Sequence, residues 1–318
     1  MAAPLAIVIP AYKARFLDET LRSIAAQTCR DFVVYVGDDA SPEDLAPLCE
    51  RWRGALDLRY HRFERNLGGS DLVAQWTRCV ELATEPWVWL FSDDDRMPED
   101  AVARLLAAVA ADGEAFDLYH FNVEQIDAQG TVTDVERPYP PHLPVREYIR
   151  QRFAFELASY APDYVFRRRA FAETGGFVPF PFGWGADDAT WVRLGWRAGI
   201  RTLAGRPVQW RLSGQNISAR QGDAVPKLLA QLALLRWLQD FLAAHPPRPG
   251  EPADAQVLQG AAAWFLQQAK QLRTPFSAAL MRRACAVLPQ VAGVPRGWAL
   301  RRVLHLDLRA RWMALRLR

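Results

Sequence analysis

The sequence predicts an α/β fold, with a mainly parallel sheet flanked by helices and a helical C-terminal appendage. Between residues 5 and 111, short apolar runs of strand length alternate with amphipathic helical segments. This alternation is typical of right-handed βαβ crossovers and therefore of a mainly parallel sheet. From Val225 onward the pattern is helical and is interrupted only at proline-containing breaks. We therefore expect two regions, residues 1–220 and residues 221–318.

The individual elements follow from apolar periodicity and from acidic or hydroxyl residues at helix starts. In the first part of the chain, we expect strands at Leu5–Pro10, Phe32–Gly37, Leu58–Phe63 and Trp87–Phe91, and helices at 18–28, Asp44–Arg53, Ser70–Ala83 and Pro98–Ala111. The middle part predicts strands at Phe116–Ile126, Thr131–Val135, Ile200–Leu203 and Val208–Leu212, and helices at Val145–Leu157 and 187–198. The last part predicts helices at Lys227–Ala244, Ala253–Arg273, Phe276–Leu288 and Trp298–Arg318.

Composition indicates a soluble cytoplasmic protein. Half of the 318 residues are hydrophobic, which is enough to bury a full core. No stretch reaches the roughly 20 uninterrupted apolar residues that a membrane span requires. The N-terminal apolar run stops at Pro10 and has no basic residue before it, so we interpret it as a buried strand and not as a signal peptide. The four cysteines have no spacing typical of a zinc site or a disulfide framework.

Trp87–Asp100 contains the densest group of candidate functional residues. An apolar strand ends there in three consecutive carboxylates, Asp93, Asp94 and Asp95. Open α/β sheets bind ligands at the carboxyl ends of their strands, and adjacent carboxylates repel one another unless a cation compensates them. Mg²⁺ is commonly held by one or two carboxylates together with substrate phosphates and water. The segment therefore suits a metal–diphosphate site, although acids at a loop start also serve as plain turn and capping residues.

Four motifs occur in order along the chain: IVIPAY, VGDDAS, FSDDD, and GGF followed by GWGADDATWVRLG. In this order and spacing the chain resembles the inverting, nucleotide-sugar-dependent glycosyltransferases of family 2, which have the Rossmann-like fold called the glycosyltransferase A-type fold. The resemblance covers residues 5–215, about two thirds of the chain. It implies an enzyme that uses Mn²⁺ or Mg²⁺ and a nucleotide-sugar donor.

The resemblance implies a donor site made by the first three motifs. Tyr12 would lie against the nucleotide base, and Asp39 would accept the N3–H group of a uracil or thymine ring. Asp95 would ligate the metal, and Asp93 would lie near the ribose or the water shell of the metal. The complete set of nucleotide-binding residues would be Pro10, Ala11, Tyr12, Asp39, Asp93 and Asp94.

The fourth motif implies the acceptor side. Asp188 matches the catalytic base of the family, with Asp187 in the place of a glutamate, and Trp184 and Gly185 would shape the acceptor site. The chemistry agrees, because an attacking sugar hydroxyl needs a carboxylate within about 2.6–3.2 Å to take its proton. The start of a helix also keeps such a carboxylate charged. Attack in a single displacement inverts the anomeric configuration.

Several of these residues have a purely structural alternative. Asp187 and Asp188 would also serve as caps of the helix that follows them. Asp38 and Asp39 would also serve as turn residues before Ser41. Tyr12 has the alternative of a core aromatic.

The chain departs from the family pattern in three places. Many relatives have Ala-Arg-Asn in the helix after the third strand, whereas this chain has Ala-Gln-Trp-Thr at 74–77, which leaves the phosphate and ribose contacts of that helix open. The QxxRW motif and membrane helices of processive synthases are absent, since Gln209 and Trp210 are followed directly by Arg211. Relatives often complete the metal site with a histidine, but Trp210–Ser218 has none. We therefore expect single sugar addition and a metal held by Asp95, the diphosphate and water.

These observations predict a transferase that adds one sugar to a glycan or lipid-linked acceptor, in bacterial surface polysaccharide synthesis. A UDP- or dTDP-sugar is the favoured donor, and no nucleic-acid partner is expected. One alternative is a catalytically degenerate relative that acts as a binding or scaffold protein. Another is a nucleotidyltransferase, but that class normally needs a glycine-rich, basic phosphate loop near the first strand, and Ile7–Arg15 offers none.

Positive charge is concentrated at the C-terminus. Lys270–Arg318 contains eleven Lys or Arg residues and one acid, Asp307, a local charge of +10; the preceding residues therefore carry −7 to give the total of +3. Within Trp298–Arg318, apolar residues recur at three- and four-residue spacing among six arginines. Such a helix either packs its apolar face on the protein or lies peripherally on an anionic membrane surface, and both arrangements are compatible.

Overall fold

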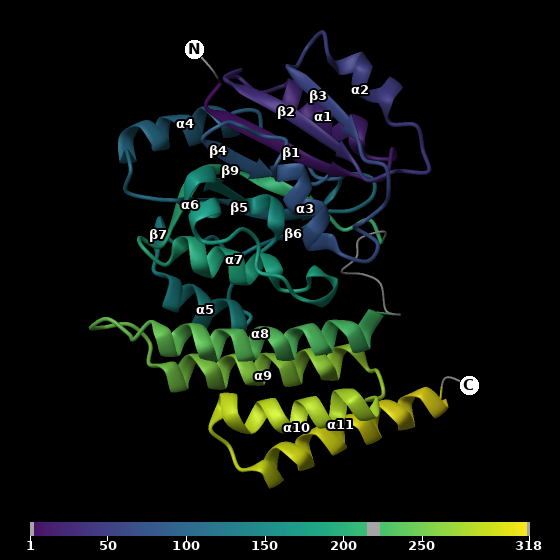
Figure 1. Ribbon diagram of the computed structural model, residues 1–318, viewed down its shortest axis with the longest axis vertical. Helices are drawn as coiled ribbons and strands as arrows, with labels where there is room; N and C mark the ends of the chain where they lie inside the picture. The colour runs from purple at the N-terminus through teal and green to yellow at the C-terminus, as the bar shows by residue number, and fades with distance from the viewer. Residues whose placement is uncertain (1–2, 215–222, 317–318) are drawn as a thin grey trace. The chain divides into compact units, whose positions relative to one another are not determined.

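The computed structural model describes residues 3–214 and 223–316 (Figure 1). Its internal contacts divide the chain into two compact units. Unit 1 consists of Met1–Val145, Ala158–Val178 and Thr190–Gly214, and unit 2 consists of Arg146–Leu157, Pro179–Ala189 and Gln215–Arg318. The boundary expected at residue 220 lies outside the described residues. Unit 2 also contains two segments that we expected in the N-terminal region.

Unit 1 is built on a nine-stranded sheet. Its first half is parallel, in the order β3-β2-β1-β4, and consists of β1 (Leu5–Ala11), β2 (Phe32–Asp38), β3 (Leu58–Arg62) and β4 (Trp87–Leu90). The second half is mixed, and its strands are β5 (Leu118–Ile126), β6 (Val132–Val135), β7 (His142–Leu143), β8 (Tyr164–Arg167) and β9 (Ile200–Arg211). There β8 lies antiparallel between β4 and β5, and β9 runs parallel to β5. The α/β fold is confirmed, with the parallel arrangement confined to the first four strands and the β5–β9 pair.

The prediction of two separate strands near the end of unit 1 is wrong. Ile200–Leu203 and Val208–Leu212 belong largely to the single strand β9, whose register against β5 shifts between Phe121 and Val123. The backbone bulges there because Arg104 donates hydrogen bonds to the carbonyls of Ala204 (2.8 Å) and Arg206 (2.7 Å). Those carbonyls are thereby satisfied without a neighbouring strand.

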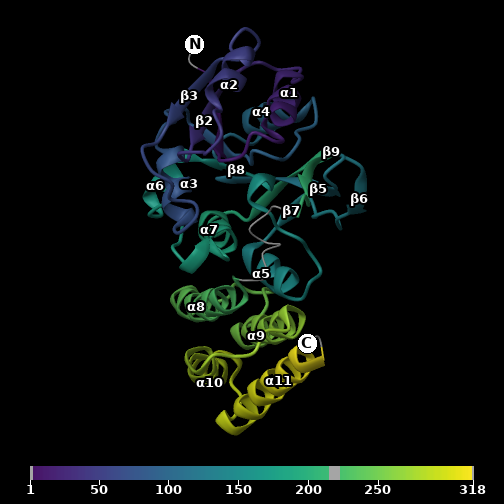
Figure 2. The same ribbon diagram turned by 90° about the vertical axis from the view of Figure 1, so that its right-hand side faces the viewer.

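Helices cover both faces of the parallel half of the sheet (Figure 2). Three helices, α1 (Leu17–Ala25), α2 (Ala46–Trp52) and α4 (Ala101–Asp112), share one core cluster with alternate residues of β1, β2 and β4. Helix α3 (Leu72–Val80) packs on β1 and β2 from the opposite face, where a side chain at Gly37 would collide with the sulfur of Cys79. The remaining helix within unit 1 is α6 (Arg168–Glu173). These layers leave the carboxyl ends of β1, β2 and β4 at one edge of the sheet.

Unit 2 is helical. Its long helices are α8 (Ala224–Ala244), α9 (Asp254–Leu272), α10 (Ala278–Ala292) and α11 (Arg296–Arg316). The shorter segments are most of α5 (Val145–Phe153), the 3₁₀ turn η2 (Pro181–Gly183) and the start of α7 (Ala186–Gly195). The fully buried Arg146 of α5 donates to the carbonyls of His245 (2.6 Å) and Pro252 (3.0 Å), and so fastens the connection between α8 and α9.

One expectation about unit 2 is overturned by the end of helix α10. We expected a break at Pro289, but α10 continues through it and ends at Gly293, which adopts the left-handed conformation (φ 65°) that glycine tolerates best. Over the described residues, no helix combines the length and the apolar character that crossing a bilayer requires.

Candidate active site

The loops after β1, β2 and β4 meet at one edge of the sheet. The carboxylate of Asp93, which follows β4, accepts hydrogen bonds from the backbone amides of Tyr12 (2.9 Å) and Lys13 (3.2 Å), which follow β1. The amide of Asp39, which follows β2, donates to the carbonyl of Ala11 (2.9 Å). The parallel strands therefore bring the first three motifs together.

Tyr12 projects from this edge. Its side chain is 39% exposed, so the alternative that it is a core aromatic is wrong. Its carbonyl accepts a hydrogen bond from the hydroxyl of Ser41 (2.7 Å), which fixes the backbone of the loop. Pro10 and Ala11 are the last residues of β1 and lead directly into it. An exposed aromatic ring on an anchored loop is suited to stacking on a nucleotide base.

Asp95 is the most buried member of the acid triplet, with no exposed surface. One carboxylate oxygen, Oδ1, accepts the backbone amide of Arg211 (2.7 Å). The other oxygen, Oδ2, is buried and has no hydrogen-bond partner among the described residues. Because a buried acceptor is normally paired, this orphaned oxygen fits a ligand that binds there, and a hard divalent cation is the ligand that a carboxylate oxygen favours.

The three carboxylates influence one another strongly. Burial raises the pKa of Asp95 well above its usual range, and the charge of Asp94 adds to this. Burial raises the pKa of Asp94 to about 7, and the charge of Asp93 acts in the same direction. Burial also raises the pKa of Asp93, against the amides of Tyr12 and Lys13. Across residues 3–214 and 223–316, no cluster of three or more His, Cys, Asp or Glu side chains is arranged to hold a metal.

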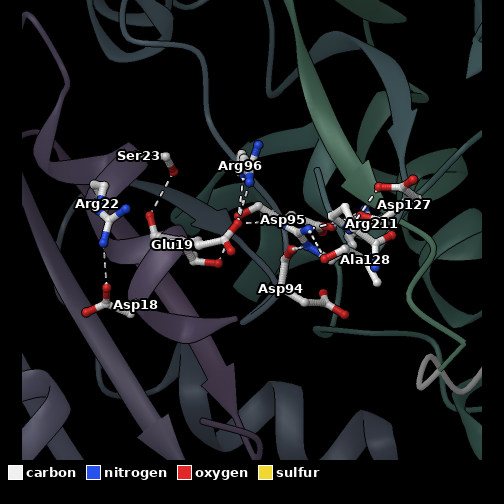
Figure 3. A network of polar contacts seen from close by, with 12 residues as sticks. Asp18, Glu19, Arg22, Ser23, Asp94, Asp95, Arg96, Asp127, Ala128 and Arg211 are labelled. Carbon is white, nitrogen blue, oxygen red and sulfur yellow. Dashed lines mark hydrogen bonds and ion pairs between the residues drawn. The ribbon is translucent and has the colours of Figure 1, made fainter. Parts of the chain in front are cut away.

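A fully buried arginine holds the acid triplet in place (Figure 3). Arg211, the last residue of β9, donates from Nε to the carbonyl of Asp94 (2.7 Å) and from Nη1 to the carbonyl of Asp127 (3.0 Å). Its Nη2 donates to the carboxylate of Glu19 (2.7 Å), and its guanidinium lies 4.3 Å from the ring centre of Phe16. With its backbone amide on Asp95, this one residue holds both the backbone of Asp94 and the carboxylate of Asp95.

Glu19 of α1 links Arg211 to a second arginine, Arg96, which also donates to its carboxylate (Figure 3). Burial would raise the pKa of Glu19, but the hydrogen bond from Arg96 and the charges of both arginines hold that pKa below its usual range. No sequence motif points to Glu19 or Arg96, and Arg211 stands out in the sequence only by its mismatch to QxxRW.

The two acids at the end of β2, Asp38 and Asp39, have different surroundings. Asp38 accepts from the hydroxyl of Tyr60 (2.5 Å), from Arg62 (2.7 Å) and from the backbone amide of Ser41 (2.7 Å), so the structural alternative holds for it. Asp39 is predicted to bind the base. Its carboxylate accepts four hydrogen bonds within the chain, from the side chains of Asn66 and Arg78 and the amides of Leu67 and Gly68. A carboxylate has about four lone-pair positions, so a base would replace one of these donors.

Arg78 belongs to the helix in which the family arginine was missing. Gln75, at the second position of the Ala-Gln-Trp-Thr segment, accepts a hydrogen bond from Nε of Arg78 (2.6 Å), and Arg78 reaches the carboxylate of Asp39. The guanidinium also lies 3.8 Å from the ring centre of Phe63. A cation is therefore present at the β2 acid pair, supplied one helical turn later than the family pattern expects.

The part of the fourth motif that contains the acid pair belongs to unit 2, whereas GGF and residues 190–195 belong to unit 1. Asp188, in the first turn of α7, is 5% exposed. Its Oδ1 accepts from the hydroxyl of Tyr148 (2.8 Å) and from Nε of Arg152 (3.0 Å), and its Oδ2 accepts from Nη2 of Arg152 (3.2 Å). Tyr148 and Arg152 are four residues apart on α5 and so project from the same face. The sequence analysis did not find these two partners.

Asp187 is partly exposed, whereas Ala186 before it is fully buried. Burial raises the pKa of Asp187 to about 7, and the charge of Asp188 contributes. Gly185 has a φ of 83°, and a side chain there would press on Leu234 of α8, so only glycine fits. Trp184 stands beside Lys227 of α8, whose ammonium lies 4.8 Å from its ring centre. Trp184 and Gly185, two of the predicted acceptor-side residues, thus lie where the 181–188 segment meets α8.

The fold and the acid motifs identify the class of protein, and comparison with known proteins agrees. The chain belongs to glycosyl transferase family 2, whose family model matches residues 6–175, just over half of its length. Its sequence is 34% identical over 128 residues to the PGL/p-HBAD biosynthesis glycosyltransferases of Mycobacterium bovis and Mycobacterium tuberculosis. That match covers 39% of this chain and 48% of each relative, so the chain spans about half the length of the curated relatives it matches.

Solved structures share the fold. Residues 1–349 of Staphylococcus aureus TarS, in complex with UDP-GlcNAc, superpose with a TM-score of 0.56 at 16% identity, covering 95% of this chain and 89% of that one. The mannosyltransferase PcManGT from Pyrobaculum calidifontis, in complex with GDP-Man and Mn²⁺, gives a TM-score of 0.50 at 19% identity, covering 98% of this chain and 87% of that one. At these identities the likeness concerns the fold, and it confirms the predicted A-type architecture.

Proposed function

We propose that this glycosyltransferase moves one sugar, with inversion, from a nucleotide-sugar donor to a glycan or lipid-linked acceptor in the synthesis of bacterial surface polysaccharides. The observation that supports this most is the buried Oδ2 of Asp95, which has no partner among the described residues and lies at the carboxyl edge of a parallel sheet. Loop ends at that edge bind ligands in open α/β folds. The exposed ring of Tyr12 and the acid Asp39 belong to the same edge.

On this proposal, Asp95 would hold Mn²⁺ or Mg²⁺ through its carboxylate, together with the diphosphate of the donor and water. Such an ion acts as a Lewis acid that stabilises the charge on a leaving phosphate. Asp93 keeps the Tyr12 loop closed against the strand end, while Asp94 and Asp95 keep their orientation through Arg211. The donor is a UDP- or dTDP-sugar, because Asp39 would accept the N3–H group of uracil or thymine. The UDP-GlcNAc complex of TarS supports a uridine donor by analogy of fold.

The reaction is a single displacement. The acceptor hydroxyl oxygen forms a bond to the anomeric carbon, the bond from that carbon to the diphosphate oxygen breaks, and the nucleoside diphosphate leaves with its electron pair. Asp188 takes the hydroxyl proton. Its two oxygens are held by Tyr148 and Arg152, which orient the carboxylate, and one of these bonds must yield to the acceptor. The enzyme acts at the cytoplasmic side, where nucleotide sugars are made.

Release of nucleoside diphosphate tests this proposal. Purified protein is incubated with UDP-, dTDP- and GDP-sugars, with Mn²⁺, Mg²⁺ or a chelator. Metal-dependent release from a uridine or thymidine donor is expected, and it should be lost in Asp95→Asn. Asp57→Asn is the matched control, since Asp57 is exposed and lies after α2, away from the motifs. Absence of release from every donor would favour the alternative of a degenerate binding or scaffold protein.

A further inference from the structure

Helix α11 of unit 2 presents a continuous apolar stripe to solvent. Five of its large apolar side chains are exposed, namely Leu300 (44%), Leu304 (39%), Leu308 (64%), Trp312 (53%) and Leu315 (73%). They recur every three or four residues and therefore share one face of the helix. We call these five residues the α11 stripe.

The α11 stripe is not the face by which the helix packs. Against α10 and α9, α11 buries a different row, Ala299, Val303, Asp307 and Ala310. Asp307 fixes this row, because it accepts the backbone amide of Phe276 (2.8 Å) and Nε of Arg311 (2.8 Å). Helix α11 thus packs through this row, which contains only alanine, valine and the anchored Asp307. The five large side chains of the α11 stripe do not take part in this packing.

The charge around the stripe has one sign. Of the ionised residues of α11, six are arginines and the single acid, Asp307, is buried and paired. The guanidinium of Arg316 lies over the ring of Trp312, 3.8 Å from its centre. A shallow hollow on this face is lined by apolar and basic side chains, namely His305, Leu308, Arg309, Arg311, Trp312 and Leu315. Apolar residues bordered by arginines and tryptophan match the boundary between lipid headgroups and acyl chains.

We propose that the α11 stripe and its arginines dock the protein on the surface of a membrane rich in anionic phospholipid. The alternative occupant, a second copy of the same helix, would bring two rows of arginines together without an exposed acid on α11 to offset them. An anionic lipid surface supplies the complementary charge. The helix would lie in the interface plane, with the stripe toward the acyl chains and the arginine side chains extended to phosphate groups. A lipid-linked acceptor would be met at that surface, a link that rests on the proposed function.

Sedimentation of the full chain with vesicles tests the docking surface and needs no transfer activity. Vesicles of phosphatidylcholine alone are compared with vesicles that contain phosphatidylglycerol. Binding is expected only to the anionic vesicles, and it should weaken about tenfold or more when salt is raised, since each arginine contact is screened. Failure of the transferase assay would leave this result intact, and failure of vesicle binding would leave the transferase proposal intact.

Two sets of variants separate the contributions. The double variant Leu308→Gln, Leu315→Gln removes exposed apolar surface. The double variant Arg302→Gln, Arg309→Gln removes positive charge. Each double variant should bind vesicles about tenfold or more weakly than the wild type, while its unfolding curve stays unchanged. The control pair, Arg22→Gln with Arg169→Gln, removes two exposed arginines of unit 1 and should bind like the wild type.

Three results would overturn the proposal. They are no binding of the wild type to anionic vesicles, equal binding by the leucine pair and the wild type, and a dimer in lipid-free solution that the leucine pair dissociates.

Discussion

Replacing Arg211 by methionine should destabilise unit 1 and disable the acid triplet together. The change keeps the buried stem but removes a guanidinium that donates to the carbonyls of Asp94 and Asp127 and to the carboxylate of Glu19. Two part-buried carbonyls lose their donor, and Glu19 keeps only Arg96. Glu19 is 35% exposed, so water compensates much of its loss of Arg211, whereas each of the two carbonyls left without a donor costs about 1–3 kcal/mol. We expect a loss of about 3–5 kcal/mol, a large share of the roughly 5–15 kcal/mol of an ordinary domain.

Urea unfolding followed by circular dichroism measures this loss. The matched control is Arg22→Met, because Arg22 is an exposed arginine of α1 that pairs with Asp18, and a surface pair of this kind contributes at most about 1 kcal/mol. Arg211→Lys should lose most of the stability that Arg211→Met loses, because a lysine ammonium cannot reach the three acceptors that the planar guanidinium contacts. If the unfolding free energies of Arg211→Met and the control differ by less than about 1 kcal/mol, the hydrogen bonds of Arg211 do not hold the Asp93–Asp95 loop in place, and the prediction is wrong.

The remaining predictions concern the acid pairs. Asp39→Ala should weaken uridine and thymidine nucleotides by about 1.5–3 kcal/mol in calorimetric titration, because a charge-assisted hydrogen bond is lost; unchanged affinity would mean that the base binds elsewhere. Asp188→Asn should keep donor affinity near that of the wild type and lower turnover about 10²- to 10⁴-fold; a parallel loss of donor affinity would contradict the role of base. Since burial raises the pKa of Asp187 from 3.8 to about 7, the folded state holds a proton that the unfolded chain releases, and the wild type should lose stability as the pH rises through that interval. Asp187→Asn should not show this loss, so the difference in unfolding free energy between the variant and the wild type should change between pH 3.8 and about 7. If that difference is the same at both pH values, the raised pKa is not that of Asp187.

The parts of the fold that could be predicted are those with local signals. Three of the first four strands are apolar runs, whereas β3 (LRYHR) is largely polar, and all four occur with ends within two residues of the expected positions. The continuity of β9 could not be predicted, because its bulge depends on Arg104, which is about 100 residues away in the sequence. A proline normally predicts the end of a helix, because it cannot donate the backbone hydrogen bond. In α10 the helix continues past Pro289, because the free energy gained by burying its last turn exceeds the cost of that lost hydrogen bond.

In the candidate site, too, only the residues with a local sequence signal could be predicted. Asp93, Asp39 and Tyr12 could be placed at one edge, because carboxyl ends of parallel strands coincide. The arginines that hold the acids could not be found. Arg211 is 117 residues from its partner Asp94, and Arg152 is 36 residues from Asp188, and nothing in their local sequence separates them from solvated arginines.

Nucleotide binding tests the central claim most directly. Thermal unfolding is recorded with UDP, dTDP, GDP and CDP, each with and without Mn²⁺, for the wild type, Asp95→Asn and the control Asp57→Asn. A ligand at 100 times its dissociation constant stabilises a fold by about 2.7 kcal/mol. The account predicts a metal-dependent rise in melting temperature with UDP or dTDP for the wild type and the control, and none for Asp95→Asn. An equal rise in Asp95→Asn, or no rise with any nucleotide and metal in the wild type, would contradict it.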